Sequence, residues 1–122
     1  MKFDDSIPLY LQIKREIENA IITDSVKEDK PIPSIRNLAQ EYRVNPQTIS
    51  NAVGELMQEG ILYKKRGIGM FVQPGAREIL REKKCKIFRE DEFPEIIRKG
   101  KTLGIKMGEL INIIKNEYKK EV

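Results

Sequence analysis

Two short amphipathic helical patterns, separated by only a few residues, constrain the fold of this chain most. In the first, Ser34 is a suitable N-cap, and apolar residues then recur at helical spacing as far as Tyr42. In the second, Asn45 followed by Pro46 is a strong helix start, and apolar residues recur until Gly60, a natural stop. The shortness of the connection predicts a helix-turn-helix.

A basic β-hairpin is expected directly after the second helix. Two short strands, at 61–65 and 69–73, flank a turn that holds Gly67, where a positive φ is needed. An earlier amphipathic helix is expected over about residues 8–23. These elements predict a mainly α-helical chain with a small hairpin, which is a winged helix-turn-helix over residues 1–75.

Residues 76–122 have a different pattern and are expected to form a helical tail. The basic segment 77–89 is predicted to be helical, and a further helix is predicted to start near Phe93. Pro94 is tolerated there only if a new helix begins at the acidic residues 91 or 92.

The apolar stripes of the tail predict a dimer. A stripe on a short helix must be buried against another surface, and a tail of this length cannot enclose a large core alone. Two copies of the tail can bury the stripes against each other, although a tail folded back onto its own winged domain is an alternative. The expected dimerisation residues are Phe93, Ile96, Ile97, Met107, Leu110, Ile111, Ile114 and Tyr118.

The charge of the chain suggests a nucleic-acid partner without establishing one. The chain has 23 Lys and Arg against 19 Asp and Glu, a net charge of +4. Residues 1–75 contain ten bases and ten acids, so the whole surplus lies in the tail. Three bases, at 64–66, nevertheless stand on the expected hairpin in a stretch without an acid, so a neutral domain can still present a basic edge.

The composition excludes several classes of protein. The chain has no His, which rules out Ser/His/Asp and Cys/His triads and the common mixed zinc sites. No catalytic constellation or metal cluster remains, and no cofactor is expected. Cys85 is the only cysteine, no apolar run is long enough for a membrane span, and the acidic start does not resemble a signal peptide. We therefore expect a non-enzymatic protein of the cytoplasm, with no membrane association.

The outer face of the second helix is polar and neutral, as base reading requires. Gln47 and Asn51 can pair with adenine in bidentate fashion, and the methyl group of Thr48 can contact thymine. The N-termini of both helices offer N–H groups to phosphates, and hairpin bases can contact phosphates or enter the minor groove. The candidate DNA-binding residues are Ser34, Arg36, Asn45, Gln47, Thr48, Ser50, Asn51, Lys65, Arg66 and Gly67. The alternatives are a solvated helix face, a solvated turn, and a surface ion pair of Arg36.

The chain resembles the GntR family of bacterial transcription regulators. The resemblance rests on the segments 7–13, 32–39, 44–49, 56–60 and 66–72, which have the order and spacing of that family. It implies that the arginine after the Pro-Ser pair, the polar residues that open the recognition helix, and the wing tip contact DNA. The short tail is similar to that of the YtrA-type subgroup, in which it serves dimerisation.

Pattern and resemblance together predict a dimeric transcription regulator that acts as a repressor, although the sequence does not separate a repressor from an activator. A twofold dimer places two recognition helices about 34–36 Å apart and so predicts a palindromic operator in double-stranded DNA. The alternative is a winged-helix module that binds another protein and has no specific affinity for DNA. The sequence identifies neither the operator nor a small-molecule inducer.

Overall fold

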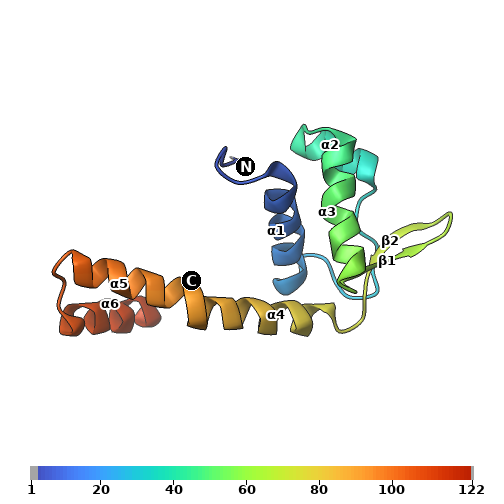
Figure 1. Ribbon diagram of the computed structural model, residues 1–122. Helices are drawn as coiled ribbons and strands as arrows, with labels where there is room; N and C mark the ends of the chain where they lie inside the picture. The colour runs from blue at the N-terminus through green and yellow to red at the C-terminus, as the bar shows by residue number, and fades with distance from the viewer. Residues whose placement is uncertain (1–2, 122) are drawn as a thin grey trace. The chain divides into compact units, whose positions relative to one another are not determined.

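The computed structural model describes residues 3–121 and divides into two compact units after Glu82. The first unit holds three helices and a two-stranded antiparallel sheet, followed by the start of a fourth helix (Figure 1). Its elements are α1 (Leu9–Ile22), α2 (Ile35–Tyr42), α3 (Pro46–Gln58), β1 (Leu62–Lys65) and β2 (Gly69–Val72). The predicted winged helix-turn-helix is thereby confirmed.

The two helices of the helix-turn-helix begin at the residues that the sequence indicates. Ser34 and Asn45 are the N-caps, and each accepts a hydrogen bond from a backbone N–H of the first turn. Pro46 follows as the first residue of α3, where its fixed φ suits a helix and its missing N–H costs nothing. α3 ends at Gln58, and Gly60 follows with a φ of 75°.

The wing is a hairpin widened by the loop that precedes α2. Leu62 lies opposite Val72, and Lys65 lies opposite Gly69 across a tight turn. The backbone N–H of Ile32 also donates to the carbonyl of Met70 at 2.9 Å. This loop therefore pairs with the edge of β2 and joins the hairpin to the start of α2.

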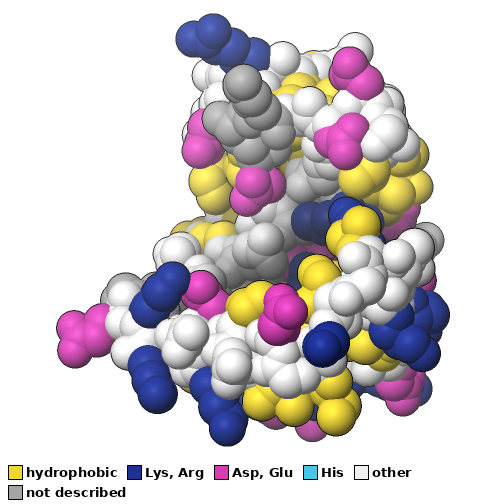
Figure 2. All heavy atoms as spheres, turned by 90° about the vertical axis from the view of Figure 1, so that its left-hand side faces the viewer, with side chains coloured by type: hydrophobic (Ala, Val, Ile, Leu, Met, Phe, Trp, Pro, Cys, Tyr) yellow, Lys and Arg dark blue, Asp and Glu magenta, His cyan; other side chains and the backbone are white. Residues whose placement is uncertain are grey.

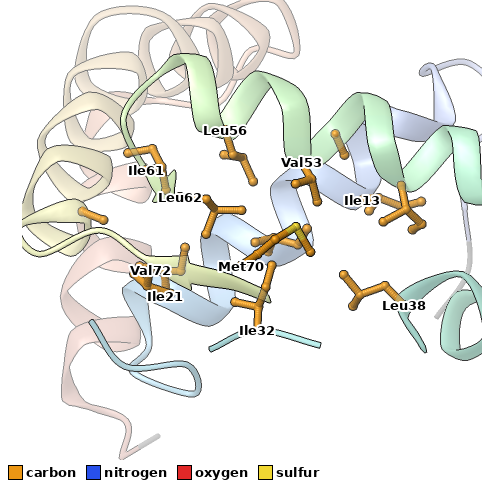
Figure 3. Close-up of a cluster of buried hydrophobic side chains, with 14 of the residues drawn as sticks. Ile13, Ile21, Ile32, Leu38, Val53, Leu56, Ile61, Leu62, Met70 and Val72 are labelled. Atoms are coloured by element: carbon orange, nitrogen blue, oxygen red, sulfur yellow. The ribbon is translucent and has the colours of Figure 1, made fainter. Parts of the chain in front are cut away.

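A single hydrophobic core holds the first unit together (Figure 3). α3 packs against both α1 and α2, and the hairpin contacts the end of α3. The side chains with almost no exposure come from each of these elements and include Ile13, Ile21, Ile49, Leu56, Ile61, Leu62 and Val72. Because α3 buries its apolar face in this core, its opposite face is turned to solvent.

The first turns of α4 (Ala76–Ile87) belong to this unit. Leu80 is fully buried in the core. The Glu28 carboxylate accepts hydrogen bonds from the backbone N–H groups of Gly75 and Arg77, at 2.8 and 3.2 Å. The Arg77 side chain donates in turn to the carbonyl of Ile22 at the end of α1, at 2.8 Å. The compact unit thus extends beyond residue 75, and a functional boundary there stays a prediction.

The second unit continues the helical tail. A π-helical turn (Phe88–Glu92) joins α4 to α5 (Phe93–Thr102), and the N–H of Phe93 bonds to the carbonyl of Phe88. Pro94 lies in the first turn of α5 as expected, but no break precedes it, because Glu92 keeps helical dihedral angles. The wider π turn takes the place of a new helix start. A turn at Gly104, with φ of 78°, leads to α6 (Met107–Lys119).

We predict that Leu56→Ala lowers the free energy of unfolding by about 2–5 kcal/mol, because it leaves a cavity at a site with no solvent exposure. Urea denaturation followed by circular dichroism measures the change. Ile79→Ala is the control, since this side chain is exposed and its removal should cost about 0.5 kcal/mol or less. Equal losses in the two variants would contradict the assignment of the core.

Candidate nucleic-acid interface

The start of α2 carries the first predicted residues. The Ser34 hydroxyl accepts a hydrogen bond from the backbone N–H of Asn37 at 3.1 Å. Other N–H groups of the first turn have no partner within the helix and point out of its N-terminus, where they suit an anion. Arg36 is the second residue of α2 and is exposed, so a guanidinium stands beside these donors.

The turn between α2 and α3 adds a cation that sequence reasoning did not single out. Arg43 follows α2 in the left-handed conformation with φ of 57°, which is uncommon for a residue with a side chain. Its side chain is exposed, while the next residue, Val44, packs against the core and anchors the turn. The sequence indicates this cation only by placing a basic residue in the short connection before Asn45.

The outer face of α3 presents an ordered pair of amides. Gln47 and Asn51 lie one turn apart and are both exposed, and the Gln47 amino group donates to the Asn51 carbonyl oxygen at 3.0 Å. The other two groups of this pair, the Gln47 carbonyl and the Asn51 amino group, are an acceptor and a donor. The major-groove edge of adenine presents the complementary combination. Thr48 and Ser50 lie beside them and are half-buried.

The two lysines of β1 point to opposite faces of the wing, because side chains alternate along a strand. The Lys65 ammonium lies 4.4 Å from the centroid of the Phe71 ring and 5.9 Å from that of Tyr63. These are cation–π distances, so Lys65 is held over the aromatic face. Lys64, which was not among the candidate residues, lies on the other face and lines a groove toward α2 and α3.

This groove has a volume of about 500 Å³ and lies between α2, α3 and the wing. It brings together three of the predicted residues, Ser34, Arg36 and Ser50, and adds Lys64. The rest of its lining is mainly apolar: Pro31, Ile32, Ile35, Val53, Met57, Ile68 and Met70, with Gly54 and Gly69. Two cations and two hydroxyls beside apolar walls suit a sugar–phosphate strand, which alternates an anion with a less polar sugar.

The wing tip is separate from the groove. Arg66 and Gly67 are exposed and do not contribute to the groove lining, and Gly67 has a φ of 78°. Ile68, which follows the tip and lines the groove, has 73% of its surface exposed, an unusual place for a large aliphatic side chain. Nine of the ten predicted DNA-binding residues therefore fall into three sets: the groove, the outer face of α3, and the hairpin. The tenth, Asn45, is the N-cap of α3, and its side-chain oxygen accepts a hydrogen bond from the backbone N–H of Gln47 at 2.8 Å.

A buried ion cluster joins α1 to the end of the recognition helix. Lys14 is only 8% exposed, and its ammonium lies 3.0 Å from a carboxylate oxygen of Glu55 and 2.6 Å from one of Glu59. Burial alone would lower the pKa of Lys14, but the hydrogen bonds to Glu59 and Glu55 and their charges outweigh it and raise the pKa. The raised pKa favours the charged form of Lys14. No sequence signal pairs these residues, which lie more than 40 positions apart.

The predicted dimerisation residues form an open apolar surface on the tail. Five of them are exposed: Ile96, Met107, Ile111, Ile114 and Tyr118. The other three, Phe93, Ile97 and Leu110, are half-buried. α6 has no buried residue at all. Figure 2 shows such hydrophobic side chains at the surface among Lys and Arg side chains. The assignment of these residues to a dimer interface stays a prediction.

The described part of the chain meets the requirements of neither a metal site nor a membrane-spanning helix. Within residues 3–121 no group of three or more Cys, Asp or Glu residues is arranged to hold a metal ion. Over the same residues, no helix combines the length and the apolar character needed to cross a membrane.

Comparison with known proteins identifies the family. Residues 9–72 match the family model described as bacterial regulatory proteins, gntR family. The chain is 33% identical to the uncharacterised HTH-type regulator YhcF of Bacillus subtilis, with 93% of each chain covered, and 31% identical to the repressor YtrA of the same organism, with 90% and 84% covered. The chain is also 36% identical to the arabinose metabolism repressor of Geobacillus stearothermophilus. This match covers 78% of the present chain but only 28% of the repressor.

Solved structures agree with this assignment. A GntR family transcriptional regulator from Listeria monocytogenes superimposes with a TM-score of 0.78 at 33% identity, over 93% of this chain and 98% of that one. The DNA-binding domain of AraR in complex with its operator ORE1 matches 58% of this chain and 89% of its own, with a TM-score of 0.53 at 34% identity. The similar proteins are transcription regulators and not enzymes. By its helix-turn-helix, its wing and these similarities over most of its length, the chain belongs to the GntR family of bacterial transcription regulators.

Proposed function

We propose that this chain is a cytoplasmic repressor that binds a palindromic operator in double-stranded DNA as a homodimer. The observation that carries the proposal is the polar outer face of α3, where Gln47 and Asn51 form an ordered amide pair, next to a groove that holds two cations. The names of the relatives YtrA and the arabinose repressor support repression over activation.

Each part of the surface has a distinct task in this proposal. The N-terminal half of α3 enters the major groove, where Gln47 and Asn51 read adenine and Thr48 contacts thymine. Arg36 and Lys64 bind phosphates of the strand that occupies the groove between helices and wing. The wing tip, with Arg66 and Gly67, approaches the minor groove.

The tail brings a second copy of the chain, whose winged domain reads the second half-site. The apolar residues of α5 and α6 pair with those of a second copy, which hides side chains that are otherwise open to water. Two winged domains joined in this way bind two half-sites of opposite orientation, and so the operator is a palindrome.

A protein-interaction module is the competing function, since a hairpin and a helix can also bind a partner chain. DNA binding through phosphates gives an association constant that falls with salt, at a log–log slope of about −0.9 for each phosphate neutralised. A wild-type protein with no salt-sensitive affinity for any duplex would favour the competing function.

We predict that Gln47→Ala weakens binding to the operator by about 10- to 100-fold and removes the preference for adenine at one position in each half-site. Fluorescence anisotropy with operators that carry single base changes measures both effects. Gln40→Ala is the matched control, because this exposed glutamine lies near the end of α2 and lines neither the groove nor the outer face of α3. An equal loss of affinity on every sequence would argue against base reading by Gln47.

We predict that Arg36→Ala behaves differently, because a phosphate contact carries no sequence information. The affinity should fall by about the same factor for all duplexes, and the log–log salt slope should become shallower by about 0.9. Salt titrations of the operator and of an unrelated duplex test this. A loss confined to one base position would instead assign Arg36 to base reading.

We predict that a single charge on the apolar face of α6 disrupts the proposed dimer. Ile114→Glu should weaken self-association by about 100-fold or more, since an unpaired buried charge costs about 3 kcal/mol or more. Asn112→Glu adds the same charge on the opposite face of α6 and should leave association unchanged. Analytical ultracentrifugation gives the association constants, and a dimer indifferent to Ile114→Glu would exclude this face as the interface.

A further inference from the structure

The recognition helix has the wrong charge for its proposed partner. α3 contains no basic residue, its only charged side chain is Glu55, and Glu59 follows directly after it. Both carboxylates are about one-third exposed, with side-chain values of 36% and 35%. Two negative charges, one on α3 and one directly after it, oppose the entry of this helix into a phosphate-lined groove unless something offsets them.

Glu55 stands close to the residues proposed to read bases. A polar surface hollow of about 490 Å³ beside α3 is lined by Glu55 together with Ser50, Asn51, Gly54, Gln58 and Tyr10. Ser50 and Asn51 belong to the proposed reading face, so Glu55 borders the same open surface one turn further along the helix. Its carboxylate is therefore close enough to the proposed reading residues for its charge to act on a bound phosphate.

Lys14 is placed to offset these charges from the core side. It lies on α1, is almost fully buried, and its ammonium is within hydrogen-bond distance of both carboxylates, at 3.0 and 2.6 Å. The single positive charge of Lys14 offsets half of the two negative charges that the carboxylates carry. The same contacts hold both side chains toward α1.

We propose that Lys14 is a positioning residue for DNA binding, which neutralises part of the negative charge of the recognition helix and draws Glu55 and Glu59 away from the phosphates. This inference rests on the proposed function. It assigns a role in DNA affinity to a buried residue that does not itself touch DNA.

A merely structural ion cluster makes a different prediction. In that case the loss of Lys14 would change the stability of the protein, while the folded fraction would bind DNA as before. An electrostatic role instead weakens the folded protein's affinity, the loss shrinks as salt screens the charges, and neutralising Glu55 restores the affinity. A double-mutant cycle separates the two roles.

The experiment uses the full chain and a short DNA duplex of arbitrary sequence, because the effect does not depend on base reading. Lys14→Met keeps the apolar part of the side chain and removes the charge, and binding is measured well below the thermal midpoint of every variant. We expect the dissociation constant to rise by about 3- to 20-fold at low salt, with a smaller rise at about 0.2 M salt. Lys14→Met/Glu55→Gln should regain most of the affinity.

Two further variants keep the test decisive. Lys27→Met removes one charge from an exposed loop lysine and should have a smaller effect, which controls for net charge. Glu55→Gln in the wild-type background should tighten binding by about 2- to 5-fold, and it tests whether the Glu55 charge opposes DNA binding even if Lys14→Met does not fold.

Unchanged affinity in Lys14→Met, no rescue by Glu55→Gln, or an equal loss in Lys27→Met would overturn the role of Lys14 alone. Absence of DNA binding by the wild-type chain would overturn the proposed function as well.

Discussion

The burial of one face of α3 is the constraint on which the rest of the winged unit depends. Ile49, Ala52 and Leu56 have no exposed surface and lie between α1, α2 and the hairpin. Their spacing fixes the rotation of the helix about its axis, because a helix with one apolar stripe can turn only that stripe to the core. Gln47 and Asn51 are therefore presented to solvent by residues that are never exposed themselves.

Local signals made the fold of this unit predictable. The Asn45-Pro46 start, the Gly60 stop and the glycine turn of the hairpin each act within a few residues, so the sequence contains all of the information for them. The reading residues of α3 follow from the same periodicity, since whatever is not apolar on an amphipathic helix faces outward. The family resemblance adds their assignment to DNA.

Contacts between distant residues could not be predicted in this way. Lys14 meets Glu55 and Glu59, and Glu28 meets the start of α4, only because the fold brings segments more than 40 positions apart together. The position of Lys64 could have been predicted from the sequence, because side chains alternate along a strand and Lys64 must therefore lie on the opposite face of the wing from Lys65. The π-helical turn could not be predicted, because Pro94 is equally compatible with a new helix start and with a continuous helix that contains a π turn.

The alternation in the wing has a consequence for how such a hairpin can change in evolution. Lys64 faces the groove and Lys65 lies over the Phe71 ring, and their assignment depends on the strand register. Inserting or deleting one residue in β1 would exchange the two faces, taking the groove lysine to the aromatic side. Changes of two residues preserve the faces, so wings of this kind are expected to lengthen and shorten in even steps.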